Sequence, residues 1–393
     1  MSKAAEAENA DTPKPRKDKV AASQLKPKLS KAERREDKQR GTKQEIAPTS
    51  SISSDSDVLR DLRIFSHFGT SARITGHSVP SKADIHPAVS RLALQFSSFR
   101  VVGANARCIA TLSALKTVIQ QYHTPSGTTL SRHLPTYLSP QITHLVAARP
   151  MSTSMGNAIR YMKYEISILS IDVPEQEAKR FLSERLDAFV RERILLADLV
   201  IQSHAIEKIK DGDVVLTFAR SSVVEGVLLK AHELGKRFTV IVVDSGPLFE
   251  GGKQLLSSLA NAGIKSTYCL LSGISTAISG ASIAYLGAHS LHANGALYSR
   301  AGTALVAMMA KQHSVPVLAC CETYKFSNGV PFDGFTKNEL VPDLTQEPRP
   351  YLQSLNPLYD LTPASMISAV VTEVGLIPPS SIPTLLHREG IPE

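Results

Sequence analysis

The 393-residue sequence is poor in cysteine, and its cysteines are not arranged to bind zinc. The four are Cys108, Cys269, Cys320 and Cys321, and no two of them form a Cys-x-x-Cys pair. Structural zinc sites depend on such closely spaced thiolates, so the common zinc-binding spacings are excluded. A few cysteines without a pairing pattern are typical of a protein from a reducing compartment.

Long apolar runs are also missing. No stretch approaches the ~18 consecutive apolar residues of a membrane-spanning helix, and the N-terminus is charged, unlike a signal peptide. Hydrophobic residues still make up 42% of the chain, enough for a core, and a chain of this length holds about two domains. We therefore expect a soluble protein of the cytoplasm (cytosol) with no membrane contact.

The glycine-rich motifs that bind nucleotides are absent as well. No Gly-x-Gly-x-x-Gly follows a predicted strand, and there is no Gly-Lys-Ser/Thr phosphate loop. Such loops bring backbone amides close to a phosphate group. Their absence argues against a dehydrogenase or an NTPase, and we expect neither a cofactor nor a bound metal.

Most of the net charge of +8 lies at the N-terminus. Residues 1–45 hold 13 Lys/Arg against 8 Asp/Glu, so they supply +5 of it. Residues 1–55 contain no aromatic residue and few large apolar ones, and they cannot bury enough surface to offset the entropy of ordering. We predict a disordered basic tail over 1–55. Its interspersed acids dilute any attraction to RNA, and no specific nucleic-acid partner is expected.

Residues 56–209 show helical periodicity. In the segment 105–122 apolar residues recur every three or four positions, as on one face of a helix. The segment 174–209 begins with Pro174 and acidic residues, a typical helix start, and at ~1.5 Å per residue it exceeds about 45 Å. Its predicted buried stripe consists of Leu182, Leu186, Phe189 and Ile194.

The pattern changes after Gly212, where short and almost continuous apolar runs alternate with helical stretches. Buried parallel strands have this pattern. Residues 210–393 are therefore predicted to form a Rossmann-like α/β domain with a doubly wound parallel sheet. Near its end, Thr362 followed by Pro363 predicts the start of a helix. The predicted strands cover 213–219, 238–245, 266–272, 282–290 and 315–321.

The stretch LGAHSLHANGALYSRAGT (286–303) raises the main functional question. It is predicted as the end of a strand, a tight turn at Asn294-Gly295 and a helix that begins at Gly302-Thr303. Ligands of doubly wound sheets lie beyond the strand carboxyl ends, where this loop lies. Arg300 has two interpretations, an anion ligand at a helix N-terminus or a cap of its own loop.

The residues of this stretch are similar to those of a known family. The members of this family are the regulatory subunits of translation initiation factor 2B and the methylthioribose-phosphate and ribose-bisphosphate isomerases. The shared pattern is Gly-Ala, five residues, Asn-Gly, then a basic residue and Gly-Thr. The segments 105–122, 315–326 and 356–378 resemble the delta branch of the family, so the resemblance covers nearly the whole chain. The pattern appears here at Gly287, Ala288, Asn294, Gly295, Arg300, Gly302 and Thr303.

The resemblance also implies that catalysis is lost. The isomerases use a cysteine after the first domain strand and an aspartate in the glycine loop, and these positions here are Ala219 and His289. Moving a proton between two sugar carbons requires a group that gives and takes one, and alanine has none. We expect a catalytically inactive relative of these enzymes. The alternative, a working sugar-phosphate isomerase, is weakened by Ala219.

As a delta-type chain, the protein is expected to be a regulatory subunit of the guanine nucleotide exchange factor for initiation factor 2. The resemblance implies direct pairing with beta, a two-fold decamer that also holds the alpha, gamma and epsilon subunits, and exchange activity on epsilon. It further implies sensing of the phosphorylated alpha subunit of initiation factor 2. The second alternative, an RNA-binding protein with a basic tail, is weakened because no aromatic and basic RNA platform is visible.

The resemblance assigns three residues of this chain to the phosphorylation-sensing surface. Arg132 lies in LSRHL, and Glu192 and Leu196 lie in RERILLAD, four residues apart and so on one helix face. Each has a structural alternative. Arg132 is otherwise a solvated arginine, Glu192 a member of a surface ion pair, and Leu196 a core residue.

Overall fold

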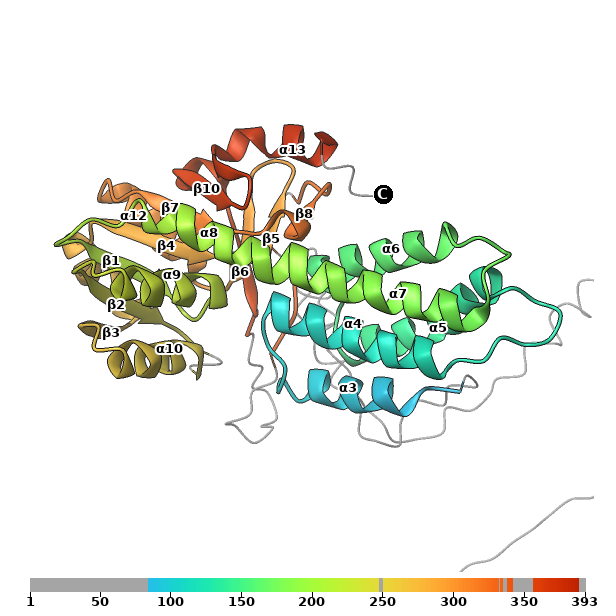
Figure 1. The fold of residues 1–393 in the computed structure, drawn as a ribbon. Coiled ribbons are helices and arrows are strands. Elements are labelled where there is room, and N and C mark those ends of the chain that lie inside the picture. Colours follow the sequence, from blue (N-terminus) through green and yellow to red (C-terminus); the bar gives the residue numbers. More distant parts are fainter. Residues whose placement is uncertain (1–83, 247–249, 332, 335–337, 342–355, 389–393) are drawn as a thin grey trace, which may run out of the picture. The chain divides into compact units, whose positions relative to one another are not determined.

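The computed structural model describes residues 84–246, 250–331, 333–334, 338–341 and 356–388 (Figure 1). The predicted disordered tail, 1–55, lies outside the described residues, and so does 56–83. No helix in the described ranges is both long and apolar enough to cross a membrane. The division of the chain into 1–55, 56–209 and 210–393 stays a prediction.

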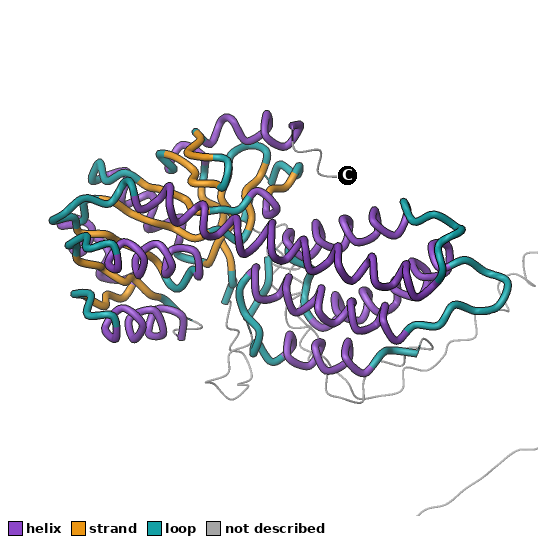
Figure 2. Tube along the Cα trace, viewed as in Figure 1, coloured by secondary structure: helices purple, strands orange, loops and turns teal. Residues whose placement is uncertain are grey.

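The first half of the described chain is helical, as its periodicity predicted, and Figure 2 shows it as helices joined by loops. Apolar residues at spacings of three and four on these helices form one core, which includes Leu112, Leu115 and Leu186. The side chain of His86 accepts a hydrogen bond from the backbone amide of Ala88 and caps the N-terminus of α3. The helices are α3 (Pro87–Ser97), α4 (Ala104–Gln121), α5 (Leu130–Ala148), α6 (Thr153–Ser167) and α7 (Glu175–Phe189).

The long helix predicted over 174–209 is present, but it is not regular. Helix α7 passes without a break into a π-helical segment, η2 (Val190–Leu196), and then into α8 (Ala197–Ile206). Figure 1 shows α7 and α8 as one continuous rod. Phe189 and Ile194 are both buried although they are five positions apart in the sequence. A π turn, closed by i→i+5 hydrogen bonds, accommodates that spacing.

The second half contains the predicted doubly wound sheet, in the order β11-β10-β7-β4-β1-β2-β3. All neighbours pair in parallel except β10 and β11. Alternate strand residues enter different cores. Val215 packs on one face of the sheet and Leu216 on the other. The strands are β1 (Val214–Phe218), β2 (Thr239–Asp244), β3 (Ser266–Leu270), β4 (Ile283–Gly287), β7 (Val317–Cys320), β10 (Ala369–Thr372) and β11 (Gly375–Ile377).

Helices cover both faces of this sheet. On the face of Val215 lie α8, α9 (Ser222–Glu233) and α10 (Glu250–Asn261). On the face of Leu216 lie α11 (Ile274–Ala277), α12 (Thr303–Gln312) and α13 (Ile382–Arg388). Short 3₁₀ segments complete the connections: η3 (Leu271–Gly273), η4 (Ile278–Gly280), η5 (Thr323–Lys325), η6 (Ala364–Met366) and η7 (Pro379–Ser381).

A second sheet of four short strands was not predicted. Its order is β8 (Phe326–Ser327), β5 (Ser290–His292), β6 (Leu297–Arg300) and β9 (Tyr359–Thr362). The stretch 286–303 therefore forms the hairpin β5–β6, with the expected tight turn at Gly295, whose φ is +75°. Helix α12 then begins at Thr303, as predicted.

The predicted helix start at Thr362-Pro363 is wrong. Thr362 is the last residue of β9, and only the 3₁₀ segment η6 follows it. Beyond η6 the chain enters strand β10, whose sequence is AVVT. The β-branched Val370, Val371 and Thr372 favour a pleated, buried strand over a helix, and this preference outweighs the local N-cap signal.

Candidate functional site

A cavity of about 470 Å³ lies at the carboxyl ends of β1 and β4. The chain runs from β1 outward through β2 to β3 and returns to the other side of β1 with β4. The cavity is therefore at the topological switch point of the sheet, the position where doubly wound sheets bind ligands. The start of α4 closes one side of it. Its lining includes Asn105, Ala219, Ser221, Gly287, His289, Arg300 and Lys325.

Ala219 occupies the position directly after β1 in an uncommon backbone conformation. Its φ is +52°, in the left-handed region, and its backbone amide donates a 2.8 Å hydrogen bond to the carbonyl of Val243. A residue other than glycine rarely adopts this conformation, and such residues concentrate at functional sites. The backbone of the site is thus held in a specific shape, but the side chain it presents is a methyl group, which transfers no proton.

His289 is buried at the edge of the cavity, with its ring centroid 4.3 Å from that of Tyr359. Burial, together with the nearby charges of Arg107 and Arg149, holds the pKa of this histidine well below its usual range. The imidazole is consequently neutral at physiological pH. A base with so low a pKa is poorly matched to proton transfer near neutral pH.

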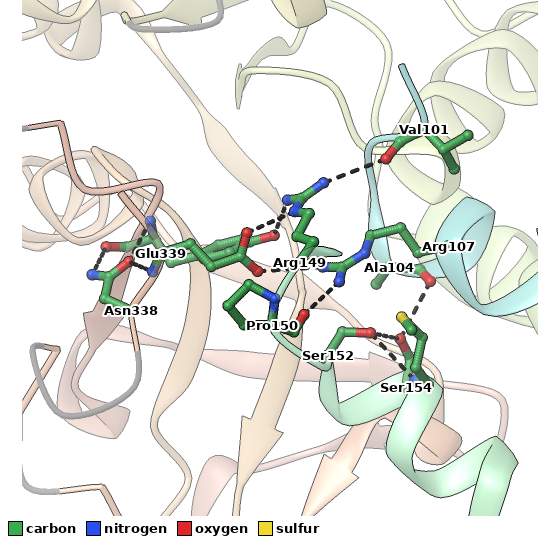
Figure 3. Close-up of polar contacts among 11 residues, drawn as sticks. Val101, Ala104, Arg107, Arg149, Pro150, Ser152, Ser154, Asn338 and Glu339 are labelled. Atoms are coloured by element: carbon green, nitrogen blue, oxygen red, sulfur yellow. Dashed lines mark hydrogen bonds and ion pairs between the residues drawn. The ribbon is translucent and has the colours of Figure 1, made fainter. Parts of the chain in front are cut away.

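Two buried arginines hold one buried glutamate (Figure 3). Nε of Arg149 lies 2.7 Å from one carboxylate oxygen of Glu339, and Nη1 of Arg107 lies 3.3 Å from the other. Arg107 also donates to the carbonyl of Pro150 at 2.5 Å, and Arg149 donates to the hydroxyl of Tyr359 at 3.3 Å. These contacts fasten the ends of α4 and α5 to the segment 338–341.

Arg300 does not cap its own loop. The N-terminus of α12 is capped by Asp360, whose carboxylate accepts hydrogen bonds from the amides of Gly302 (2.7 Å) and Ala304 (3.0 Å). Within the described ranges, the guanidinium of Arg300 makes no hydrogen bond or ion pair. Burial lowers the pKa of Arg300 from its usual value. The guanidinium is therefore a cavity-lining cation with bonding capacity to spare.

The charges around the cavity are unbalanced. Arg107, Arg149, Arg300 and Lys325 all act on His289, whereas Glu339 neutralises part of this charge. Lys325 has its own partner, since its Nζ lies 2.6 Å from Oε2 of Glu322. The surplus of positive charge makes the cavity chemically suited to an anion.

The 3₁₀ segment η5 connects this site to the helices. The side-chain amide of Asn105 takes part in two hydrogen bonds. Its Nδ2 donates to the carboxylate of Glu322 at 2.6 Å, and its Oδ1 accepts from the hydroxyl of Tyr324 at 2.6 Å. Asn157 on α6 donates to the carbonyls of Tyr324 (2.7 Å) and Phe326 (2.9 Å). Because these polar groups satisfy one another, the junction between helices and sheet is well defined.

The cysteines that end β7 are structural. Cys320 and Cys321 are fully buried, and burial raises the pKa of both thiols above the usual value. A buried thiol with a raised pKa is a poor nucleophile.

The three residues assigned to the sensing surface are all exposed, but they do not lie together. Arg132 is in the first turn of α5, and Glu192 and Leu196 are in η2. The loop before Arg132 and the start of α7 line the same surface hollow, so Arg132 lies near the N-terminal end of α7. Glu192 lies beyond the other end of α7. At ~1.5 Å per residue, roughly 25 Å of helix therefore separates Arg132 from Glu192. The side chain of Glu192 is 60% exposed and pairs with Arg191 at 3.2 Å, and Leu196 is 48% exposed. The core alternative for Leu196 is therefore wrong.

Sequence reasoning missed most of the residues around the cavity. For Arg107 a signal existed, since it falls on the buried stripe of α4 beside Cys108, Thr111 and Leu112. A charged residue on an apolar stripe indicates a buried partner. Glu339 carries no such signal, because its partners lie far away in the sequence.

Comparisons with known proteins agree with this geometry. The model of the initiation factor 2 subunit family matches residues 100–379. The translation initiation factor eIF2B subunit delta of Schizosaccharomyces pombe is 44% identical over 347 residues, which cover 84% of this chain and 74% of that protein. The ribose 1,5-bisphosphate isomerase of Pyrococcus furiosus is 31% identical over 255 residues, covering 62% of this chain and 78% of the enzyme.

Among solved structures, the crystal structure of the tetrameric eIF2B β2δ2 complex from C. thermophilum contains a similar chain. It is 38% identical, with a TM-score of 0.72, and the match covers 79% of this chain and 96% of that one. The resemblance predicted from the sequence motifs is thus confirmed. The chain belongs to the initiation factor 2 subunit family, and within it is a close homologue of the eIF2B delta subunits.

Proposed function

We propose that this chain is a non-catalytic regulatory subunit of the guanine nucleotide exchange factor for initiation factor 2. The observation that carries the proposal is the extent of the match to a chain of the eIF2B β2δ2 tetramer, 96% of that chain. Ala219 supports the absence of isomerase activity, because it places a methyl group where the related enzymes have their proton-transferring cysteine.

In this proposal the chain pairs directly with a beta subunit and helps to build a two-fold decamer in the cytosol. The same assembly holds the alpha, gamma and epsilon subunits, and epsilon carries the exchange activity. The division of the chain into a tail (1–55), a helical domain (56–209) and an α/β domain (210–393) belongs to the same proposal.

The chain also senses phosphorylation of the alpha subunit of initiation factor 2, through Arg132, Glu192 and Leu196. The exposure of all three supports this role, because a residue in the core is not available to a partner. A guanidinium such as that of Arg132 is suited to ordering a phosphate-bearing segment. The roughly 25 Å between Arg132 and the other two requires a partner surface that spans that distance.

Co-expression tests the assembly part of the proposal. The chain alone is expected to be poorly soluble, and the chain with a beta subunit is expected to purify as a stable complex, because obligate interfaces often bury about 2,000 Å² or more. A well-behaved monomer without affinity for beta subunits contradicts the proposal. In the same preparation, ribose 1,5-bisphosphate is expected to remain unconverted.

A second candidate function is the binding of a phosphorylated small molecule without turnover. The surplus cations around the 470 Å³ cavity favour it, above all Arg300. The test is thermal unfolding of the complex with ribose 1,5-bisphosphate or inorganic phosphate. The candidate predicts a concentration-dependent rise in the melting temperature that Arg300→Gln removes. Equal curves with and without the sugar phosphate rule it out.

A further inference from the structure

Arg107 and Arg149 are two buried cations that share a single anion. Neither side chain is exposed, and in the described part of the chain the carboxylate of Glu339 is the one acidic group that forms an ion pair with either. Nε of Arg107 is buried and has no hydrogen-bond partner among the described residues. A buried guanidinium needs anions or other acceptors to offset its lost hydration. The pair therefore has the composition of an anion-binding site that holds one of the protein's own carboxylates.

The contacts of this carboxylate are those that a small oxyanion makes (Figure 3). Arg149 donates from Nε to one oxygen at 2.7 Å, and Arg107 donates from Nη1 to the other at 3.3 Å. Carboxylates and phosphates both bind guanidinium groups through such paired N–H···O bonds. The geometry of the two arginines thus selects an oxyanion, and a glutamate side chain is one way to supply it.

The arginine pair adjoins the 470 Å³ cavity. Phe99 and Tyr359 line the cavity, and both contact Arg149. Cζ of Arg149 lies 4.5 Å from the centroid of the Phe99 ring, and Nη2 donates to the hydroxyl of Tyr359 at 3.3 Å. These two side chains are therefore a wall shared by the cavity and Arg149. An anion from the cavity that binds Arg149 has to take the place of the Glu339 carboxylate.

The backbone of Glu339 is anchored independently of its carboxylate. Its carbonyl accepts a 2.8 Å hydrogen bond from the amide of Leu358, and its amide donates to Oδ1 of Asn338 at 2.8 Å. Nδ2 of Asn338 donates in turn to the carbonyl of Tyr359 at 2.7 Å. None of these bonds involves the side chain of Glu339, so a substitution there removes the anion and keeps the backbone around it.

We propose that Glu339 is a built-in ligand of an anion site formed by Arg107 and Arg149, and that its carboxylate closes this site to free carboxylates and phosphates. The closure is independent of the regulatory role, and it limits the second candidate function. An external phosphate meets Arg300 in the cavity, whereas the two arginines beyond Tyr359 are already occupied. Glu339→Ala opens the site, because the atoms it removes, a methylene and a carboxylate, have the size of acetate.

The test is chemical rescue, measured by thermal unfolding of the full chain in its complex with a beta subunit. Sodium acetate or inorganic phosphate is added to the Glu339→Ala variant and compared with sodium chloride at equal ionic strength. The added substitution Arg300→Gln separates this site from the cavity cation, and Arg149→Met removes the site itself. Glu165→Ala is the matched control, since Glu165 is a buried glutamate that pairs at 3.0 Å with Arg185, whose side chain is 46% exposed.

Glu339→Ala is expected to melt at a lower temperature than the unsubstituted chain. Acetate or phosphate at ten times its apparent dissociation constant is expected to raise this temperature by about 2–4 °C, as a ligand of the folded state does. The rise is expected to persist when Arg300→Gln is added and to vanish when Arg149→Met is added. No such rise is expected in Glu165→Ala, or in the Arg300→Gln chain that retains Glu339.

The absence of an anion-dependent rise in Glu339→Ala refutes the site, and so does a rise that survives Arg149→Met. An equal rise in the chain that retains Glu339, lost with Arg149→Met, shows that the site is open and refutes its closure. If Glu339→Ala yields no folded protein, Glu339→Asp takes its place with the same expected outcomes, because its shorter carboxylate leaves one arginine to the added anion. Failure to assemble with a beta subunit contradicts the proposed function alone, and the same comparisons are then made on the isolated full chain.

Discussion

The carboxylate of Glu339 lies 2.7 Å from Nε of Arg149, and both side chains are buried. Arg107 approaches the other oxygen of the same carboxylate at 3.3 Å, so one anion balances two cations that have no access to water. A buried ion pair gains little over an apolar pair, but removing one member leaves an uncompensated charge in the interior. A single substitution among Glu339, Arg107 and Arg149 is therefore expected to destabilise the fold strongly.

Glu339→Gln is expected to destabilise the chain by about 3–5 kcal/mol, because two buried guanidinium groups lose their counter-ion. Glu192→Gln is the control. It breaks an exposed pair with Arg191 and is expected to cost at most about 1 kcal/mol. Thermal unfolding of the complex with a beta subunit distinguishes the two. Equal melting temperatures for both variants show that the contacts of Glu339 with Arg107 and Arg149 do not hold the helices to the segment 338–341.

The π-helical segment η2 determines which side chains are buried, and this gives a second prediction about stability. Ile194→Ala removes a buried side chain and is expected to cost about 2–4 kcal/mol, whereas Leu195→Ala removes an exposed one and is expected to cost about 0.5 kcal/mol or less. Chemical denaturation of the two variants, each in the beta complex, measures the difference. A larger loss for Leu195→Ala than for Ile194→Ala contradicts the burial of Ile194 and the exposure of Leu195 that the π segment produces.

Asp360 gives a dependence of stability on pH. Burial raises the pKa of its carboxyl to about 6, although the amides of Gly302 and Ala304 act in the opposite direction. Since this value lies above the usual pKa of about 4 for an unfolded chain, the folded state binds the proton more tightly. The stability from Asp360 is thus fully present below about pH 4 and is lost as pH rises through 6.

Asp360→Asn removes this dependence, because asparagine keeps an acceptor oxygen and does not titrate. Between pH 4 and pH 7 the variant is expected to gain about 1–3 kcal/mol relative to the unsubstituted chain. The measurement is the melting temperature of both proteins across that range. If the melting temperatures of the two proteins change in parallel with pH, the pKa of Asp360 is the same in the folded and unfolded states.

Much of the fold could be predicted from the sequence, and the exceptions have physical reasons. Strands such as 214–218 and 239–244 are buried on both faces and so have continuous apolar sequences. The strands of the second sheet are two to four residues long and gain their stability from pairing with distant segments, so no local pattern marks them.

The site was predicted less completely than the fold. The loop 286–303 was placed correctly at the sheet edge, since its Gly295 and Thr303 have local roles in a turn and at a helix start. The partnership of Arg107 with Glu339 joins positions 232 residues apart, and the periodicity of α4 indicates only that Arg107 needs a partner. The π turn was visible as the five-residue step from Phe189 to Ile194, which a single helical stripe does not allow.

We propose that this chain regulates exchange through the exposed surface around η2, which includes Glu192 and Leu196, and does not catalyse it. The most direct measurement is nucleotide release from initiation factor 2 by the reconstituted exchange factor, with and without the phosphorylated alpha subunit. Glu192→Lys places three cationic residues in succession, with Arg191 and Arg193, and like charges at an interface cost several kcal/mol. The variant complex is expected to exchange nucleotide still, but to be inhibited much less by the phosphorylated subunit. Unchanged inhibition, or an equal loss of exchange in both conditions, would show that this helix is structural and that phosphorylation is sensed elsewhere.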